Sequence, residues 1–248
     1  MKLYTIGTGS SGNCYLLVDG NDILILDAGV NPTQRISKYL YDLRPAIPCG
    51  CLVTHEHGDH SCAVPGLVRM GIACYGSPGT AERVGFGMKA IRPYDPSWIS
   101  QDVKPFGDAF LVMAFKTNHD AAEPCGFLIT NTKTGERMIY ATDTYYMTYR
   151  FPGIHYWLIE CNYCEELLTE DTPPVLARRL STSHMSLDRL CQVFQANDLS
   201  PCRKIVLIHT SHDRGDPKMM LKRIRDQTHK PVEVTRAGYM HELTLDPF

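Results

Sequence analysis

Short runs of apolar residues, separated by small polar loops, follow one another along the whole chain. Runs of about four to eight apolar residues bounded by turn formers are typical of buried strands. The predicted strands are 3–6, 14–18, 23–26, 51–54, 72–75, 110–116, 125–131, 138–142, 156–159, 205–208, 232–235 and 241–245. The segment 132–136, which contains Gly135, predicts a hairpin turn between two of them.

Apolar residues spaced by three or four positions predict helices between these strands. The predicted helices are 32–43, 60–70, 79–85, 187–195 and 217–226. Clustered strands with interspersed helices indicate an α/β (α+β) fold, in which helices cover the outside of layered sheets. No repeat, low-complexity tract or Ser/Gly linker interrupts the chain, so we expect a single domain over residues 1–248.

Composition excludes several classes of protein. Of the 248 residues, 44% are hydrophobic and 21% are charged, and the formal net charge is −2. Such a chain is not intrinsically disordered, and it lacks the strongly basic balance of a charge-driven nucleic-acid binder. No stretch approaches the ~20 apolar residues of a membrane span, and the N-terminal residues do not form a signal peptide. We therefore expect no membrane partner.

The ten cysteines are scattered through apolar runs without regular spacing. This distribution is typical of small buried side chains in a reducing cytosol, and it predicts a cytoplasmic location. Cys161 and Cys164 have CxxC spacing, but without a second pair they cannot form a four-thiolate zinc site. A redox role for this pair is an alternative to burial.

The segment His-Glu-His-Gly-Asp-His at 55–60 places four metal-binding side chains within six residues. It follows the predicted strand 51–54, and loops at strand ends are where rigid scaffolds commonly hold ligands. Neutral imidazoles and carboxylates suit zinc, manganese or iron. A polar loop that only caps a helix through Asp59 would leave the three histidines unexplained. The segment therefore predicts a metal site at His55, His57, Asp59 and His60.

Further candidates lie directly after other predicted strands. His119 follows 110–116, Asp143 follows 138–142 and His209 follows 205–208. A single histidine at a strand end is as often a structural residue as a ligand. Three such residues at equivalent positions favour a shared site, to which the loop 55–60 also contributes.

These residues and several short motifs resemble the metallo-β-lactamase-fold hydrolases, and within them the WalJ/YycJ group. The resemblance spans nearly the whole chain, and the histidine-rich loop is its most specific part. The matching stretches are Asp27-Ala28-Gly29, 55–60, Gly9-Ser10-Ser11-Gly12-Asn13, His119-Asp120-Ala121-Ala122-Glu123-Pro124, Thr142-Asp143-Thr144, Glu160-Cys161-Asn162 and Ser183-His184-Met185-Ser186. The resemblance implies a four-layer αβ/βα sandwich with a dinuclear site at one edge of two facing sheets.

The family pattern also implies a ligand set of imidazoles and carboxylates for two divalent metal ions, zinc or manganese, with iron as a further option. One metal would be held by His55, His57 and His119; the second would be held by Asp59, His60 and His209; and Asp143 would bridge them. Asp27 would orient the histidine loop through hydrogen bonds, although it could also be a buried turn residue.

The resemblance further implies hydrolysis by a metal-activated hydroxide, with Asp59 among the catalytic residues. By analogy with ribonuclease Z-like relatives, Glu160 and His184 would protonate the leaving group, a step worth ~10²–10⁴-fold in rate. The alternative for Glu160 is a surface carboxylate, and for His184 a residue beside a helix cap.

Four functions remain open at this point. The first is a phosphodiesterase that acts as a nuclease on DNA, as the group resemblance implies. The second is a phosphodiesterase for a small cyclic nucleotide, which the weak net charge slightly favours. The third is a thioester or lactone hydrolase, and the fourth is a non-enzymatic binder with structural metals.

Two further features have an ordinary explanation beside a functional one. The loop 7–13 could bind a phosphate, although a hairpin is the commoner explanation. The basic residues between 218 and 230 could follow a phosphate backbone, although a solvated helix face is commoner.

Overall fold

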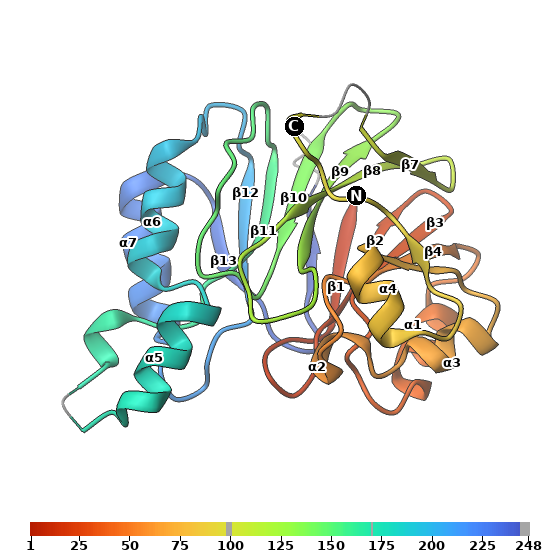
Figure 1. Cartoon of the computed structure of the whole chain (residues 1–248). Helices are drawn as coiled ribbons and strands as arrows, with labels where there is room; N and C mark the ends of the chain where they lie inside the picture. The colour runs from red at the N-terminus through yellow and green to blue at the C-terminus, as the bar shows by residue number, and fades with distance from the viewer. Residues whose placement is uncertain (98–100, 170, 244–248) are drawn as a thin grey trace.

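The computed structural model describes residues 1–97, 101–169 and 171–243. Within these residues, two seven-stranded sheets pack face to face (Figure 1). The first sheet has the order β14 (Met240–Glu242), β1 (Lys2–Gly7), β2 (Cys14–Asp19), β3 (Asp22–Leu26), β4 (Ile47–Leu52), β5 (Cys74–Gly76) and β6 (Lys89–Ala90). The strands from β14 to β3 are antiparallel to their neighbours, and those from β3 to β6 are parallel.

The second sheet repeats this arrangement with other parts of the chain. Its order is β13 (Val232–Val234), β12 (Lys204–Ile208), β11 (Tyr156–Glu160), β10 (Arg137–Ala141), β9 (Cys125–Asn131), β8 (Phe110–Lys116) and β7 (Val103–Phe106). The strands from β7 to β10 are antiparallel, and those from β10 to β13 are parallel. In both sheets the parallel strands therefore end at a common edge.

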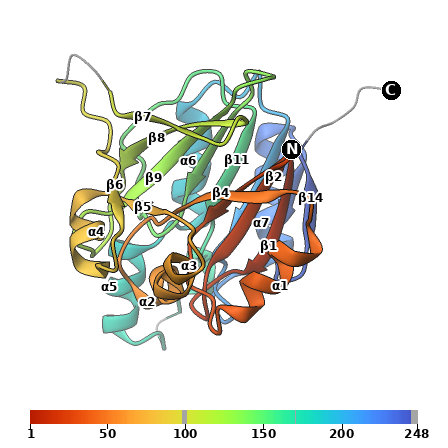
Figure 2. The same cartoon turned by 90° about the vertical axis from the view of Figure 1, so that its right-hand side faces the viewer.

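Helices cover the outer face of each sheet. The helices are α1 (Gln34–Asp42), α2 (Gly58–Ser61), α3 (Val64–Arg69), α4 (Pro78–Val84), α5 (Pro174–Ser183), α6 (Leu187–Ala196) and α7 (Pro217–Thr228), with a 3₁₀ turn at Glu165–Leu167. Figures 1 and 2 show α6 and α7 outside the second sheet, and α1 and α3 outside the first. Four layers result, so the predicted αβ/βα sandwich is confirmed.

Alternating burial explains how one short strand serves two layers. In β3, Leu24 and Leu26 face the apolar cluster between the sheets, whereas Ile23 and Ile25 face the cluster under α1. Successive side chains of a strand point to opposite faces, and both faces of these parallel strands are covered. Continuous apolar runs rather than strict alternation are therefore the expected sequence pattern.

The helix predicted over 60–70 is partly wrong, because the structure has two short helices there. The Ala63 N–H donates to the Ala28 carbonyl (2.7 Å) instead of continuing the helical ladder. Pro65, which has no N–H, occupies the first turn of α3. The break keeps Asp59 and His60 on a separate single turn, α2, beside the strand ends.

Sequence patterning missed the helix α5 and the strand β7. Only Leu180 and Ser183 of α5 are buried, so its apolar spacing is weak. The strand β7 contains Pro105, which is tolerated because β7 lies at the edge of its sheet. The prediction over 241–245 corresponds to β14, and residues 244–245 lie outside the described residues. In the part of the chain that the structure describes, no helix is long and apolar enough to cross a membrane.

Candidate metal centre

The predicted site residues converge at the edge where the parallel strands end. Asp27 follows β3, and the loop 55–60 begins three residues after β4. From the second sheet, Glu160 ends β11 and His209 directly follows β12. Because the carboxyl ends of parallel strands meet at one edge, side chains distant in sequence come together there.

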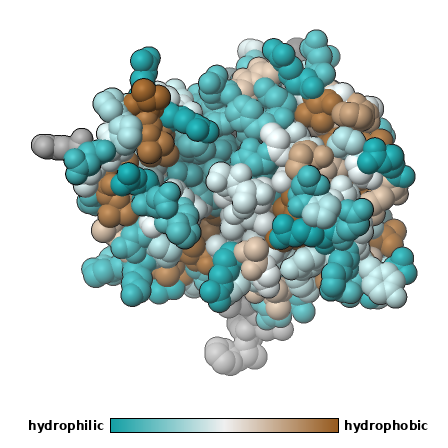
Figure 3. Space-filling view, turned by 90° about the horizontal axis from the view of Figure 1, so that it is seen from below, coloured by the Kyte–Doolittle hydropathy of each residue, from teal (hydrophilic) through white to brown (hydrophobic). Residues whose placement is uncertain are grey.

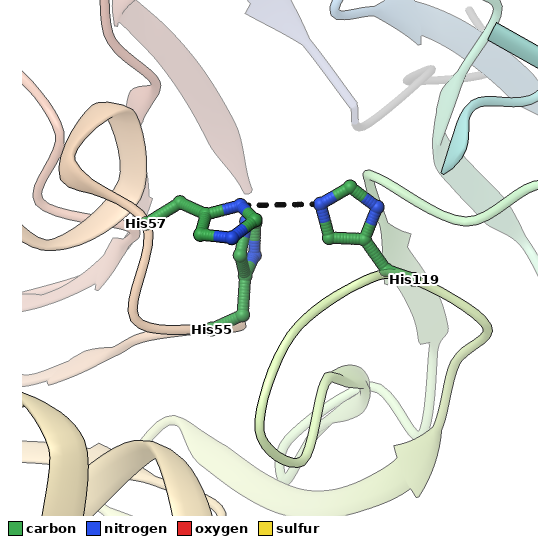
Figure 4. Close-up of side chains that lie close together, drawn as sticks. All are labelled: His55, His57 and His119. Atoms are coloured by element: carbon green, nitrogen blue, oxygen red, sulfur yellow. Dashed lines mark hydrogen bonds between the residues drawn. The ribbon is translucent and has the colours of Figure 1, made fainter. Parts of the chain in front are cut away.

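Three histidines form the first half of the centre. Figure 4 shows the rings of His57 and His119 facing each other, with His55 beside His57. His57 Nδ1 lies 3.2 Å from His119 Nε2. The His55 ring centroid lies 4.6 Å from that of His57 and 4.8 Å from that of His119. One nitrogen from each ring lies within 4.8 Å of the others, which is close enough for a shared ion.

The second half contains His60, Asp59 and His209. His60 Nε2 lies 3.6 Å from Asp59 Oδ2, and His209 Nε2 lies 3.9 Å from the same oxygen. Asp143 lies between the two halves. Its Oδ2 is 2.9 Å from His60 Nε2, and a carboxylate oxygen of Asp143 also lies within 4.8 Å of ligand nitrogens of His55 and His60. This position suits a bridging carboxylate.

Four of the histidines orient the same nitrogen toward the centre. The Nδ1 atoms interact with protein groups: His60 with Asp27 Oδ2 (2.7 Å), His209 with Glu160 Oε1 (3.0 Å), His119 with the Ser183 carbonyl (3.0 Å) and His55 with Thr54 Oγ1 (3.0 Å). Hydrogen bonds of this kind fix the ring orientation of metal-binding histidines.

The residues present fit a divalent metal ion. The Nε2 atoms of His55 and His209 are buried and have no hydrogen-bond partner among the described residues. A buried polar atom without a partner is costly, and it is rare unless a ligand or water satisfies it. The donor set of imidazoles and carboxylates suits zinc, manganese or iron. The unpartnered nitrogens point to a centre that a metal would complete.

Asp27 is completely buried and connects the two sheets at the centre. Its Oδ1 accepts from the Thr54 N–H (2.8 Å), and its Oδ2 accepts from His60 Nδ1 and from the hydroxyl of Tyr140 on β10. Tyr140 and Thr54 were not recognised in the sequence, where they are ordinary strand residues. Their positions show that Asp27 holds the histidine loop against the second sheet.

Gly29 allows the histidine loop to approach the turn after β3. A Cβ atom on Gly29 would lie 1.7 Å from the Asp59 carbonyl oxygen, so only glycine fits at this position. The backbone also ties the two segments together, because the Ala28 N–H donates to the His60 carbonyl (2.8 Å). The Asp27-Ala28-Gly29 segment thus places α2 at the sheet edge.

Glu160 joins His184 to the centre. Its Oε1 lies 2.8 Å from His184 Nδ1 and 3.0 Å from His209 Nδ1, and its Oε2 accepts from the backbone N–H groups of Thr144 and Met185. His184 Nδ1 also lies 3.4 Å from Asp143 Oδ1. Glu160 is fully buried, so the alternative of a surface carboxylate is wrong.

Asn13 and Asn162 also contact the histidines, although no role was predicted for them. Asn13 Nδ2 lies 3.0 Å from His60 Nε2, and Asn162 Nδ2 donates to the His209 carbonyl (2.8 Å). Each lies in a stretch matched to the family pattern. What marks these two asparagines is their burial beside predicted ligands, and burial cannot be read from the sequence.

Charged groups in this buried volume shift one another's pKa values. Burial opposes the charged form of His60, but the carboxylates of Asp143 and Asp27 outweigh it and raise the pKa of His60 to about 10. Burial also opposes the ionised form of Asp143, yet His209 and His60 hold its pKa well below the usual range. Negative charge on Asp143 is strongly favoured, as a cation-binding carboxylate requires.

The Glu160–His184 pair shows the same pattern. Burial disfavours charge on both groups, but their attraction and hydrogen bond lower the pKa of Glu160 and raise the pKa of His184. The protonated form of His184 is therefore stabilised beside the centre, which suits a proton donor.

Three strand-end residues of the site have left-handed backbones. The φ angles are 58° for Asp27, 47° for Asp143 and 53° for His209. Non-glycine residues adopt this region uncommonly, although aspartate and histidine do so more readily than most. Each residue turns the chain sharply at the end of its strand, so its side chain is directed to the centre. Local strain of this kind often marks functional sites.

A cavity of about 1200 Å³ opens on the centre. His57, Asp143 and His184 line its floor, and residues of the loop 7–13 and of α5 line its walls. The loop connects β1 to β2 as a hairpin, and its Thr8 Oγ1 accepts from the His209 N–H (2.9 Å). Seen from below, the middle of this face is mainly hydrophilic or neutral (Figure 3). The hairpin interpretation of the loop is confirmed, and Ser10 also reaches the cavity.

Two other sequence features have structural explanations. Cys161 and Cys164 are free, buried thiols within the apolar cluster between the second sheet and its helices. Of the basic residues near the C-terminus, Lys222 pairs with Asp226 (2.7 Å) and Arg223 pairs with Glu166 and Asp188. These ion pairs favour a solvated helix face over a track for a phosphate backbone.

A family model agrees with this geometry. The model of the beta-lactamase superfamily domain matches residues 17–210, which include every predicted metal ligand. The chain belongs to the beta-lactamase superfamily. The resemblance seen in the sequence is therefore confirmed.

Two relatives in this superfamily share about a third of their aligned residues with the chain. The exodeoxyribonuclease YycJ of Bacillus anthracis is 31% identical over 172 residues, which are 66% of this chain and 63% of that protein. The exodeoxyribonuclease WalJ of Streptococcus pneumoniae is 30% identical over 178 residues, 67% of this chain and 64% of that protein. The chain thus matches less than two thirds of the length of these relatives.

Solved structures of other proteins show the same fold. The metallo-beta-lactamase fold protein YhfI from Bacillus subtilis is 18% identical, with a TM-score of 0.70 over 97% of this chain and 98% of that chain. The short form of human tRNase Z is 14% identical, with a TM-score of 0.66 over 99% of this chain and all of that chain. At these identities the likeness concerns the fold alone.

Proposed function

We propose that this protein is a metal-dependent hydrolase, a phosphodiesterase that acts as a nuclease on DNA. The observation that carries the proposal is the Glu160–His184 pair, with its 2.8 Å contact, beside seven histidine and aspartate side chains that could bind metal. Hydrolysis of a phosphodiester expels an alkoxide, which needs a proton donor. The two relatives named as exodeoxyribonucleases support DNA as the substrate.

The proposed ligands fall into two sets. One ion would be held by His55, His57 and His119, a second by Asp59, His60 and His209, and both by Asp143. Two divalent ions, zinc or manganese with iron as a further option, would activate a water and neutralise charge on the phosphoryl oxygens. The oxygens of Asp59 and Asp143 would also accept hydrogen bonds from that water.

The protein's own groups would complete the reaction. Glu160 holds Nδ1 of His184, so the opposite nitrogen of this ring is available to substrate in the cavity. The protonated ring would donate to the leaving oxygen as the P–O bond breaks. Glu160 would stabilise the positive charge of the ring before that transfer, and its two backbone hydrogen bonds keep it in place.

The proposal includes a cytoplasmic location, supported by ten free cysteines. Nine of them are buried or partly buried, and Cys62 is exposed. Free thiols in this number persist in a reducing compartment.

A parallel assay tests the function. Purified protein and His57→Ala would be incubated with manganese or zinc and with 5′-phosphorylated duplex DNA, single-stranded DNA, RNA and cyclic nucleotides, and products would be identified by mass spectrometry. We expect mononucleotides from DNA, and loss of this release in His57→Ala. Turnover of cyclic nucleotides alone would replace the proposal with a cyclic-nucleotide phosphodiesterase. In a separate assay, hydrolysis of a thioester without any phosphodiester turnover would replace it with a thioester hydrolase.

A second prediction concerns the leaving group. His184→Ala should slow DNA cleavage by about 10²–10⁴-fold, because the alkoxide loses its proton donor. Hydrolysis of bis(4-nitrophenyl) phosphate should fall much less, since nitrophenolate leaves without protonation. Equal losses on both substrates would show that His184 supports the centre in another way. The control is His229→Ala, which removes an exposed imidazole at the end of α7 that lines neither cavity.

A further inference from the structure

A second hollow, of about 530 Å³, lies beside α5 next to the metal-centre cavity. Both hollows are lined by His119, Asp120, Arg179 and Ser183, so they are adjacent. Leu176 and Leu180 face the larger cavity, whereas Arg178 and Thr182 face the smaller one. Since successive helical residues are separated by about 100°, adjacent faces of α5 line the two hollows. In Figure 1, α5 projects below the sandwich.

This second hollow, called the α5 hollow here, is lined by arginines that have no ion-pair partner among the described residues. Arg178 and Arg179 are exposed, and within the described ranges neither guanidinium has an ion pair or a side-chain hydrogen bond. Asp120 is the one carboxylate among the residues that line this hollow. Two other arginines of the second half of the sandwich, Arg203 and Arg223, pair with carboxylates. Two free guanidiniums beside one carboxylate favour an anionic ligand.

An aromatic ring completes the hollow. Tyr145 is partly buried, and the Arg189 guanidinium lies 5.4 Å from its ring centroid. Arg189 Nη1 also donates to the carbonyls of Tyr145 (3.2 Å) and of Ser181 at the end of α5 (2.6 Å). Arg189 thus fixes the loop of Tyr145 relative to α5. An ordered ring beside guanidiniums is the combination that binds single-stranded nucleic acid, because bases stack on the ring and phosphates pair with arginine.

The hollow is also coupled to the metal centre. His119 Nδ1 donates to the Ser183 carbonyl (3.0 Å), so the last turn of α5 holds one of the proposed ligands. A DNA strand whose scissile phosphate lies over His119 would extend to Arg179 and then to Arg178. A small cyclic nucleotide bound in the main cavity would not need to reach the far side of α5.

We propose that the α5 hollow binds the nucleotide next to the scissile phosphate of a single DNA strand, with the phosphate on Arg178 and Arg179 and the base against Tyr145. This inference rests on the proposed function and extends it. According to this inference, contacts with α5 make the protein prefer a polymeric substrate to a mononucleotide. The strand therefore lies along α5 rather than along α7.

The test compares two substrates in matched variants. Arg178→Ala and Tyr145→Ala would be assayed on a single-stranded oligonucleotide and on bis(4-nitrophenyl) phosphate, which spans only the metal centre. The measured quantity is the ratio of kcat/KM for the oligonucleotide to that for the small diester. We expect this ratio to fall about tenfold or more in each variant, mainly through KM. Arg178→Lys should recover part of it.

The control variant removes equal charge elsewhere. Lys218→Ala on α7, which like Arg178→Ala removes one positive charge, should keep the wild-type ratio. The dependence of log KM on log salt should weaken in Arg178→Ala, by about 0.7 for one lost contact to a single strand, and not in the α7 control. Thermal melting would verify that each variant is folded.

Each outcome decides the inference. If the ratio in Arg178→Ala and Tyr145→Ala equals that of the wild type, or if only the α7 control lowers it, the α5 hollow is not the subsite, and the proposed nuclease function still stands. If the wild-type protein hydrolyses neither substrate with any added metal, the proposed function fails first and the inference fails with it.

Discussion

Asp143→Asn should reduce hydrolysis of DNA by at least about 10³-fold. The proposed bridging carboxylate would become a neutral amide, and one of its atoms would be an N–H donor directed at metal ions. Two-metal catalysis supplies several kcal/mol of transition-state stabilisation, and each 1.4 kcal/mol corresponds to a factor of ten. Metal content, measured by mass spectrometry of the desalted protein, should fall from about two ions per chain to one or fewer.

The matched control is Asp213→Asn at the rim of the same cavity. This carboxylate is 85% exposed and, among the residues that the structure describes, pairs only with the exposed His212, so activity and metal content should remain those of the wild type. An Asp143→Asn protein that retained both would refute the proposed ligand set. An Asp143→Asn protein that kept its metal ions but lost activity would show that Asp143 acts in the reaction and is not needed to bind metal.

Asp27→Ala should be the most destabilising single change at this edge of the sandwich. It removes a fully buried carboxylate and leaves His60, Tyr140 and the Thr54 N–H without their acceptor. Removing one partner of a buried charged pair costs about 3–5 kcal/mol. For a chain of this size that corresponds to a decrease in Tm of about 6–20 °C. Metal affinity should also fall about 10–100-fold, because His60 loses the group that orients it.

Thermal melting with and without added zinc would measure both effects. Asp42→Ala is the control, since Asp42 forms an exposed ion pair with Lys38 on α1 and contributes little. Asp27→Asn, which keeps one acceptor oxygen, should lie between the wild type and Asp27→Ala. If Asp27→Ala melted at the wild-type temperature, Asp27 would be an ordinary turn residue without the role of joining the two sheets.

The sequence predicted the strand ends of the site better than the surroundings of the site. The loop 55–60 is recognisable because four potential ligands within six residues have a chemical meaning independent of the fold. Asp143 and His209 were identified because each follows a buried apolar run. These patterns sufficed to identify the fold and to indicate which side chains would meet.

Other features depend on contacts between segments distant in sequence. Asn13 and Asn162 acquire their importance only when β2 and β11 bring them to His60 and His209. The helix α5 buries little apolar surface, so its pattern did not distinguish it from a loop. The split between α2 and α3 depends on a backbone hydrogen bond from Ala63 to Ala28, which no local pattern reveals.

Both sheets contribute to the proposed ligand set. His55, His57, Asp59 and His60 extend from the first sheet, and His119, Asp143 and His209 extend from the second. Metal ions held by residues of both sheets would link the edges of the two sheets. A ligand that binds only the closed form stabilises it by RT ln(1 + [L]/Kd). Metal affinity and the packing of the two sheets against each other would therefore be thermodynamically linked. Any substitution that destabilises the contact between the sheets would also lower the affinity for the metal ions.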